Sequence, residues 1–271
     1  MKLKGAKIVL LEARLTSELA ALVRRHGGAP ISVPALREVT LECGAEVAAL
    51  IGDLSNGVID FIVFQTGVGV QTLLNEAEKL GRKEELLAAL RRTGLIARGP
   101  KPTAVLARNG LKPAVTTPEP YTTTDLLAAM RPLELMNKTV AVLHYGERNE
   151  TLTEGLRARG ANLQEFCLYE WFLPEDTGRL TQLVGEILRG DFQAIAFTSQ
   201  IQARHLFQIA ERLGQTKELT DALNQRTVVV SIGPTCSATL RALGVEPRVE
   251  PEHPKMGPLV LALADYFEAH Q

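Results

Sequence analysis

The chain of 271 residues is 45% hydrophobic and 23% charged, so it can bury a sizeable core, which excludes disordered and fibrous proteins. Its length favours two domains, although a single large barrel also fits. Thirty Lys and Arg residues against 31 Asp and Glu give a net charge of -1. This balance excludes a broadly basic surface, so we expect no nucleic-acid or membrane partner, and local groups must bind any anionic ligand.

The cysteines and the N-terminal segment point to the cytoplasm. Cys43, Cys167 and Cys236 lie far apart in the sequence and form neither a disulfide framework nor a CxxC metal motif. The apolar run from Ile8 to Leu11 is interrupted by Glu12, so it is too short for a signal peptide or a membrane span. We interpret this run as the first buried strand.

Short β-branched runs alternate with segments of helical periodicity along the chain, which predicts an α/β fold with parallel sheets. The expected strands are Lys7 to Leu11, Phe61 to Phe64, Thr139 to Leu143, Ala194 to Phe197 and Val228 to Ile232. The first helix is expected from Thr16 to Arg25, because Gly27 and Gly28 follow it and favour a left-handed C-terminal cap.

Each half of the chain carries the same four pieces in the same order, which predicts two similar α/β domains. The pieces are a strand-helix unit (6–31 and 138–163), a second strand with its helix (from 60 and from 191), a Gly-Pro turn (97–113 and 231–247) and a closing helix (122–130 and 256–267). The repeat leaves open whether the domains are consecutive or exchange their first unit. In the exchanged arrangement, Ser32 to Glu38 and Gln164 to Phe172 would cross between the domains and pair as an antiparallel ladder.

The segment from Thr66 to Val70 follows a strand and precedes a helix, so its amides can face an anion. A tight turn without a ligand explains the same residues equally well. The third glycine of GxGxxG is missing, and Pro100 and Lys101 replace the Gly-Lys-Ser/Thr end of a Walker loop. We therefore expect no nicotinamide, flavin or ATP site.

Ligands of open parallel sheets bind beyond the carboxyl ends of the strands. Thr66, Gly99, Gly146, Thr198 and Gly233 are all expected there. Proline follows two of these glycines, a pattern that helix capping alone also explains. A cleft between two such sheet edges is the expected ligand site.

Other catalytic signatures are missing from the sequence. The five histidines show no metal-ligand spacing, so no metal is expected. No GxSxG motif occurs, and Ser199 fits a helix cap better than a nucleophile. Tyr169 lies in an extended connection, where it either faces the cleft or packs at an interface.

These features together resemble the uroporphyrinogen-III synthase family over nearly the whole chain. The resemblance rests on Arg14 after the opening strand, Val33-Pro34, the segment from Asp60 to Val70, the two Gly-Pro turns and Tyr169. It implies two Rossmann-like parallel-sheet domains joined by a two-stranded antiparallel ladder. The implied boundaries are 1–35 with 171–271 for a discontinuous domain, and 38–167 for an inserted one.

The resemblance also implies an activity, that of a cofactor-free hydro-lyase in porphyrin and haem biosynthesis. Such an enzyme cyclises hydroxymethylbilane, a linear tetrapyrrole rich in carboxylates, to uroporphyrinogen III. Water is lost, and the terminal pyrrole ring is inverted through a spiro intermediate. A cytoplasmic monomer, with a transient handover of substrate from the preceding pathway enzyme, is expected.

Site residues follow from the resemblance position by position. Tyr169 is the expected catalytic residue, assisting departure of the substrate hydroxyl. The expected substrate-binding residues are Arg14, Thr66, Gly67, Val68, Gly69, Arg98, Gly99, Lys101, Gly146, Arg148, Thr198, Ser199, Gly233 and Thr235. Cys236 stands where the family commonly has threonine, so only Thr235 is assigned at that turn.

Two other classes of function fit a pair of α/β domains. One is a two-domain protein that binds or senses a small molecule without catalysis. The other is a nucleotide-sugar or other Rossmann-like transferase, which the incomplete phosphate loops disfavour.

Overall fold

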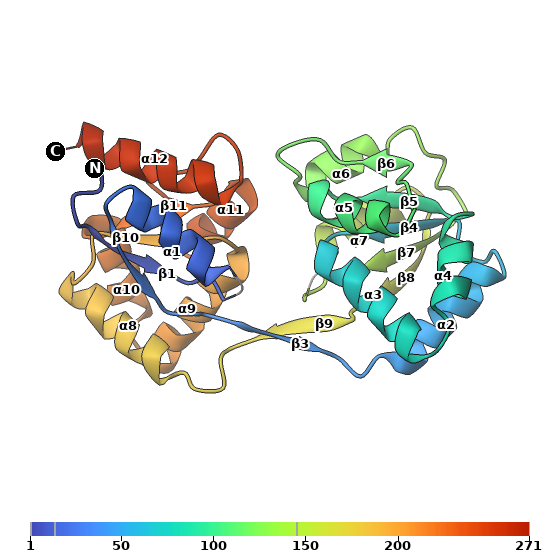
Figure 1. Cartoon of the computed structure of the whole chain (residues 1–271), viewed down its shortest axis with the longest axis horizontal. Coiled ribbons are helices and arrows are strands. Elements are labelled where there is room, and N and C mark those ends of the chain that lie inside the picture. The colour runs from blue at the N-terminus through green and yellow to red at the C-terminus, as the bar shows by residue number, and fades with distance from the viewer. Residues whose placement is uncertain (1, 14, 145, 271) are drawn as a thin grey trace. The chain divides into compact units, whose positions relative to one another are not determined.

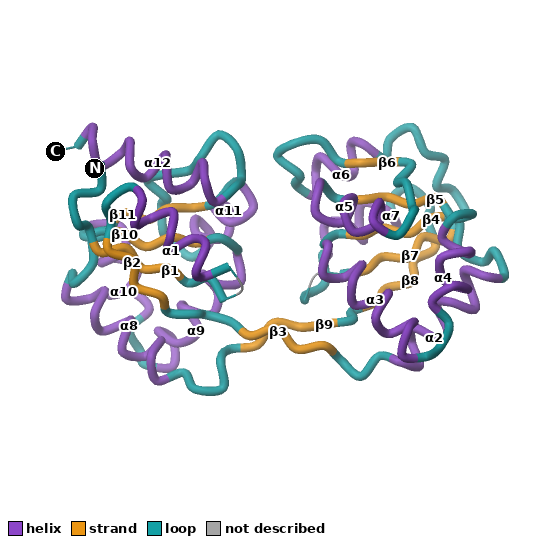
Figure 2. The backbone as a smooth tube through the Cα atoms, in the orientation of Figure 1, coloured by secondary structure: helices purple, strands orange, loops and turns teal. Residues whose placement is uncertain are grey.

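The computed structural model describes residues 2–13, 15–144 and 146–270. The chain divides into two compact units, Met1–Arg37 with Phe172–Gln271 (unit 1) and Glu38–Trp171 (unit 2). In Figure 1, the blue start and the orange-to-red end of the chain therefore belong to the same unit. Each unit has a parallel sheet between two layers of helices, which confirms the predicted α/β class (Figure 2).

Unit 1 contains a four-stranded parallel sheet in the order β11-β10-β1-β2. Its strands are β1 (Lys7–Leu10), β2 (Ala29–Ser32), β10 (Ala194–Phe197) and β11 (Val228–Ser231). Its helices are α1 (Thr16–Arg25), α8 (Gly178–Arg189), α9 (Gln200–Arg212), α10 (Thr216–Gln225), α11 (Pro234–Ala242) and α12 (Met256–Ala269). The predicted first helix is confirmed at both ends, and Gly27 after it has a φ of 84°.

Alternate side chains of β1 enter different cores, because successive residues of a strand point to opposite faces. Val9 packs with the buried residues of α8, α9, α10 and α11, whereas Ile8 and Leu10 pack with those of α1 and α12. All three side chains are fully buried. A strand that is apolar on both faces needs this double cover, which is why the run is continuously hydrophobic.

Unit 2 contains a five-stranded parallel sheet in the order β6-β5-β4-β7-β8. Its strands are β4 (Phe61–Phe64), β5 (Gly94–Ala97), β6 (Val115–Thr116), β7 (Thr139–Leu143) and β8 (Asn162–Phe166). Its helices are α2 (Gly44–Ser55), α3 (Gly67–Lys79), α4 (Lys83–Leu90), α5 (Pro100–Arg108), α6 (Thr123–Ala129) and α7 (Glu150–Arg157). Ile62 and Phe64 pack on the side of α2 to α5, and Val63 packs on the side of α6 and α7.

The two sheets have corresponding strand orders, β11-β10-β1-β2 in unit 1 and β5-β4-β7-β8 in unit 2. The unit β1-α1-β2 therefore takes the place in unit 1 that β7-α7-β8 takes in unit 2. The repeat leaves open whether the domains are consecutive or exchange their first unit. The pairing of β1 with β10 and of β7 with β4 is the pairing expected for the exchanged arrangement.

The antiparallel ladder joins β3 (Arg37–Thr40) to β9 (Tyr169–Phe172) (Figure 1). It begins later than the expected segment from Ser32 to Glu38. The amides of Val33 and Ala35 instead donate to the carbonyls of Leu10 and Leu11, at 2.9 and 3.2 Å. These bonds keep the chain on the sheet of unit 1 for several residues beyond β2.

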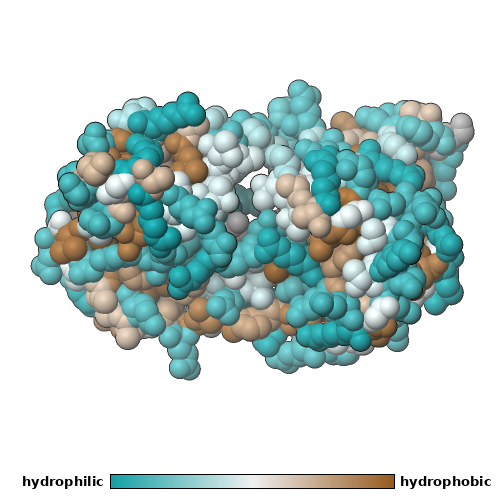
Figure 3. Space-filling view, turned by 180° about the vertical axis from the view of Figure 1, so that it is seen from behind, coloured by the Kyte–Doolittle hydropathy of each residue, from teal (hydrophilic) through white to brown (hydrophobic). Residues whose placement is uncertain are grey.

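Apolar and hydrophilic residues are interspersed on the surface. Large apolar side chains that are exposed lie scattered along the chain, namely Leu15, Val58, Leu80, Met136, Phe172, Leu213 and Leu261. On the face shown in Figure 3, brown apolar areas are accordingly small and interrupted by hydrophilic ones. Within the described ranges, no helix combines the length and apolar character needed to cross a membrane.

The domain boundaries stay a prediction about autonomous folding, and the strand pairing suggests the fragments that test it. Residues 38–171 contain every strand of the unit 2 sheet, so we expect this fragment to unfold cooperatively in urea when followed by circular dichroism. Residues 1–131 contain β1 without β10 and β4 without β7, which leaves apolar sheet edges uncovered.

The opposite result, cooperative unfolding of residues 1–131 and none for 38–171, would contradict the exchanged arrangement. The fragment ends at residue 171 rather than 167 because Tyr169 is buried within unit 2.

Candidate functional site

Three neighbouring strands of unit 2 end at one edge of the sheet. β4 lies between β5 and β7, and the helices α3 and α5 begin directly after β4 and β5. The loop after β7, of which residues 144 and 146–149 are described, leads into α7. Thr66, Arg98, Gly99, Gly146 and Arg148 all belong to these three connections, so the structure places them at the expected carboxyl edge.

Thr66 caps the start of α3. Its backbone is extended, and its Oγ1 accepts a hydrogen bond of 3.0 Å from the amide of Gly69. The same Oγ1 lies 2.8 Å from the Oη of Tyr169, whose side chain is only 1% exposed. Gly67 and Val68 form the first turn, where the helix geometry leaves backbone N–H groups without acceptors inside the helix. This turn is the part of the edge best suited to hold a carboxylate.

The two glycines of this turn also have a packing role. A Cβ at Gly67 would lie 3.0 Å from the carbonyl oxygen of Lys101 in α5, and one at Gly69 would lie 3.3 Å from Thr66 Oγ1. Neither glycine has a positive φ. Close contact between the starts of α3 and α5 therefore explains Gly67 without reference to a ligand.

The start of α5 offers fewer amides than that of α3. Gly99 has a φ of 86°, and a Cβ there would lie 2.9 Å from the ring of Tyr121. Pro100 and Pro102 have no N–H, so the first turn presents the amide and the exposed ammonium of Lys101. The helix dipole adds a favourable field for an anion at this end.

The loop after β7 approaches β9 closely at Gly146. Gly146 has a φ of 75° and forms a bridge with Glu170, and a Cβ at this glycine would lie 2.6 Å from the indole of Trp171. The side chain of Arg148 is 69% exposed, and its Nη1 lies 3.6 Å from Glu165 Oε2. The loop thus presents a cation that an acidic ligand can reach.

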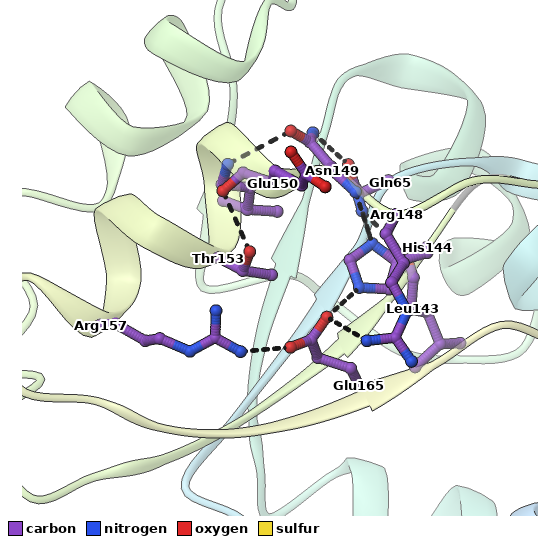
Figure 4. A network of polar contacts seen from close by, with 10 residues as sticks. Gln65, Leu143, His144, Arg148, Asn149, Glu150, Thr153, Arg157 and Glu165 are labelled. Carbon is purple, nitrogen blue, oxygen red and sulfur yellow. Dashed lines mark hydrogen bonds and ion pairs between the residues drawn. The ribbon is translucent and has the colours of Figure 1, made fainter.

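A buried polar network lies beneath this edge (Figure 4). The Nδ1 of His144 accepts a hydrogen bond of 3.1 Å from the amide of Asn149, and its Nε2 lies 3.0 Å from Glu165 Oε2. Because a backbone amide can only donate, Nδ1 is the acceptor and Nε2 carries the proton. Asn149 in turn donates 2.8 Å to Gln65 Oε1, and Arg157 donates 2.5 Å to Glu165 Oε1.

Burial lowers the pKa of His144 below its ordinary value, and the hydrogen bond to Glu165 opposes this shift only in part. The imidazole is therefore neutral at pH 7, in agreement with its role as an acceptor for Asn149.

The corresponding edge of unit 1 has a different character. Thr198 Oγ1 donates to Glu12 Oε2 at 2.5 Å and accepts from Gln202 Nε2 at 2.8 Å. Gln202 Oε1 also accepts from the amides of Thr198 and Ser199, at 2.7 and 3.3 Å. These bonds occupy the amides of Thr198 and Ser199 and the hydroxyl of Thr198, and they place a carboxyl group beside them.

The second Gly-Pro turn begins α11. Gly233 has an extended backbone with a φ of 164°, and Thr235 is exposed in the first turn. Cys236 beside it is buried, which raises the pKa of its thiol to about 11. The thiol is therefore protonated at pH 7 and is not a nucleophile.

The structure thus distributes the expected site residues between the units. Unit 2 holds Thr66, Gly67, Val68, Gly69, Arg98, Gly99, Lys101, Gly146, Arg148 and Tyr169, and unit 1 holds Thr198, Ser199, Gly233 and Thr235. Arg14 lies outside the described residues.

Sequence reasoning missed the roles of Gln65, His144, Asn149 and Glu165, which no local motif reveals because the partners lie up to 84 residues apart. Across 2–13, 15–144 and 146–270, no group of three His, Cys, Asp or Glu side chains is arranged to hold a metal ion.

Comparison with known proteins gives a consistent picture. A family model described as uroporphyrinogen-III synthase HemD matches residues 17–260. The chain is 29% identical over 266 residues to "Uncharacterized protein YjjA" of Bacillus subtilis, covering 98% of this chain and 97% of that protein. It is 29% identical over 254 residues to "Putative uroporphyrinogen-III synthase" of Methanothermobacter thermautotrophicus, covering 92% and 93%. A mutant uroporphyrinogen III synthase of Thermus thermophilus matches with a TM-score of 0.78 and 25% identity, covering 98% of this chain and 100% of that one.

The contact between Thr66 and Tyr169 can be measured by a double-mutant cycle. We expect Tyr169→Phe and Thr66→Ala each to lower the free energy of unfolding by about 1 kcal/mol, through loss of a hydrogen bond and of a helix cap. The double mutant should lose about 0.5 to 1 kcal/mol less than the sum, because both changes remove the same contact. Urea unfolding provides the measurement.

Tyr266→Phe is the matched control, because Tyr266 belongs to unit 1 and should be additive with Thr66→Ala. Strict additivity of the Thr66 and Tyr169 changes would show that their hydroxyls do not interact in solution.

Proposed function

Because the chain belongs to the uroporphyrinogen-III synthase family, we propose that it cyclises hydroxymethylbilane to uroporphyrinogen III. The substrate hydroxyl leaves as water after protonation, which produces a reactive azafulvene. The substituted carbon of the terminal pyrrole attacks this end and gives a spiro intermediate. Rearrangement then closes the macrocycle with that pyrrole inverted.

The start of α3 is the observation that carries this proposal. Its first turn presents small, uncharged residues and oriented amides at the edge of the sheet, beside the start of α5 with Lys101. An almost neutral protein can bind a carboxylate-rich tetrapyrrole with such local donors. We propose that the carboxyl edge of unit 2 holds most of these carboxylates, because Glu12 occupies the corresponding edge of unit 1.

The reaction needs control of geometry more than strong acid-base chemistry. An azafulvene reacts readily once the hydroxyl has left, so the protein must determine which carbon attacks. Backbone amides fixed by helix starts suit this task, because their positions are set by the fold rather than by flexible side chains.

Tyr169 is our candidate for the donor to the departing hydroxyl. Its Oη lies 2.8 Å from Thr66 Oγ1, at the start of the helix that is proposed to hold carboxylate. Since the side chain is 1% exposed, its hydroxyl can reach the substrate only if the phenol or the residues that cover it move during catalysis. The contact with Thr66 would then hold the phenol ready beside the bound substrate.

The cellular setting is part of the same proposal. We place the enzyme in the cytoplasm as a monomer that receives its unstable substrate by transient handover from the preceding pathway enzyme. It belongs with the lyases of tetrapyrrole biosynthesis, and it needs no cofactor.

A coupled assay with freshly generated hydroxymethylbilane tests the reaction. Spontaneous closure gives uroporphyrinogen I, whereas the protein should direct closure to the type III isomer, which chromatography of the oxidised products separates. Saturable binding of hydroxymethylbilane with only the type I product would instead identify a binding or sensor protein.

Tyr169→Phe tests the assignment of the proton donor. We expect turnover to fall by roughly 10- to 1000-fold if the phenol donates to the leaving hydroxyl. Thr66→Ala is the control, because it removes the contact of the phenol but leaves its proton. Equal and small losses in both variants would assign Tyr169 a packing role.

A further inference from the structure

We propose that His144 is a positioning residue whose buried imidazole fixes two loops of the binding edge, residues 146–149 after β7 and Gln65-Thr66 after β4. The identity of the ligand that these loops hold rests on the proposed function, but the attachment of the loops to His144 does not. Figure 4 shows the polar contacts around His144.

The first attachment closes the loop after β7. His144 Nδ1 accepts from the amide of Asn149, five residues further along the chain, at 3.1 Å. Asn149 Oδ1 accepts from the amide of Leu152 at 3.2 Å and so caps α7. The imidazole therefore joins both ends of the loop that carries Gly146 and Arg148.

The second attachment reaches the loop after β4. Asn149 Nδ2 donates to Gln65 Oε1 at 2.8 Å, and Gln65 Nε2 donates to the carbonyl of Leu143 at 3.3 Å. The same Nε2 lies 3.4 Å from His144 Nδ1. Since Gln65 directly precedes Thr66, this buried amide connects the helix cap of α3 to the loop after β7.

The third attachment sets the position of Arg148. His144 Nε2 donates to Glu165 Oε2 at 3.0 Å, and this oxygen lies 3.6 Å from Arg148 Nη1. Arg157 Nη2 binds the other carboxylate oxygen at 2.5 Å. The Glu165 side chain is 13% exposed, whereas that of Arg148 is 69% exposed. A fixed carboxylate thus orients a guanidinium that can still meet an acidic ligand.

These contacts exclude a role for His144 as a general base in this arrangement. Its only basic nitrogen, Nδ1, faces the amide of Asn149, and its side chain has no exposed surface. What the imidazole supplies is one acceptor and one donor in fixed directions.

Protonation of the imidazole would undo the first attachment, because Nδ1–H would then face the N–H of Asn149. The charged groups around it are Glu165 from β8, which favours the protonated form, and Arg148, which disfavours it. Gln65 from β4 and Asn149 contribute uncharged contacts. Burial is the largest influence and lowers the pKa, so loss of the attachment is expected in acid, below pH 6.5.

Nuclear magnetic resonance of the unmodified protein tests the attachments without reference to activity. Long-range 1H–15N correlations should show the neutral His144 ring protonated at Nε2. Its protonation midpoint should lie below 6.5, the ordinary value of the histidine pKa, and the amide shifts of Thr66, Gly69 and Asn149 should titrate with the same midpoint. An Nδ1–H ring, or amides of Thr66 and Gly69 that do not follow this titration, would overturn the proposal.

Two substitutions separate the two hydrogen bonds of the ring. His144→Asn can place its Oδ1 near the former Nδ1, keeping the acceptor for Asn149, whereas His144→Gln can place its Nε2 near the former Nε2, keeping only the donor to Glu165. For His144→Gln we expect kcat/KM with hydroxymethylbilane to fall by roughly 10- to 100-fold, mainly through KM, as binding loops shift. His144→Asn should recover most of this loss.

The pH profile identifies the titrating group. The acid decline of kcat/KM should disappear in His144→Asn and persist in His205→Gln, the control at the other buried histidine with a lowered pKa. His205 belongs to unit 1, where its Nδ1 donates to the carbonyl of Ala35. Persistence of the decline in His144→Asn, or wild-type KM in His144→Gln, would overturn the proposal.

The two proposals can fail separately. If the protein makes no type III isomer, the proposed function fails, while the ring tautomer and the shared titration of the loop amides still decide the role of His144.

Discussion

Parallel strand pairing along β1 and β7 is the constraint on which the rest of the structure depends. Both strands are apolar on each face, so each needs helices above and below. The backbone N–H and C=O groups of such a buried strand also need a partner strand on both sides. One of the two partners of β1 is β10, which lies more than 180 residues away in the sequence. The chain must therefore leave unit 1 after β2 and return to it after β9, and the β3-β9 ladder contains these two connections.

The same pairing assembles the candidate site. Because β4 is flanked by β5 and β7, three connections from separate parts of the chain begin at one edge of the sheet. Two of them are helix starts that contact each other through Gly67 and the carbonyl of Lys101. The third, after β7, is attached to its neighbour by the buried amides of Gln65 and Asn149. The edge is therefore a fixed arrangement of donors rather than a set of independent loops.

The fold could be predicted from the sequence largely because its signals are local. Runs such as Phe61–Phe64 and the cap after α1 depend on neighbouring residues, and the internal repeat exposed the correspondence of the halves. The burial of Tyr169 and the bond to Thr66 could not be predicted, since the two residues are 103 positions apart. His144 likewise has no ligand-like spacing, and its role depends on Glu165 of the adjacent strand. The close approach of Trp171 to Gly146 could not be predicted either, because these residues are not neighbours in the sequence.

Lys2, near the start of the sequence, forms ion pairs of 2.7 and 2.8 Å with Asp265 and Glu268 of α12, near its end (Figure 1). A circular permutant that joined these ends and began at Glu38 would therefore have unit 2 and then unit 1 as uninterrupted stretches. In that permuted order, the strand-helix unit would close both halves, and the exchange would become a plain tandem duplication. The natural chain order is thus that of a tandem duplication in which the last strand-helix unit has been moved to the N-terminus. This move adds a second connection between the units.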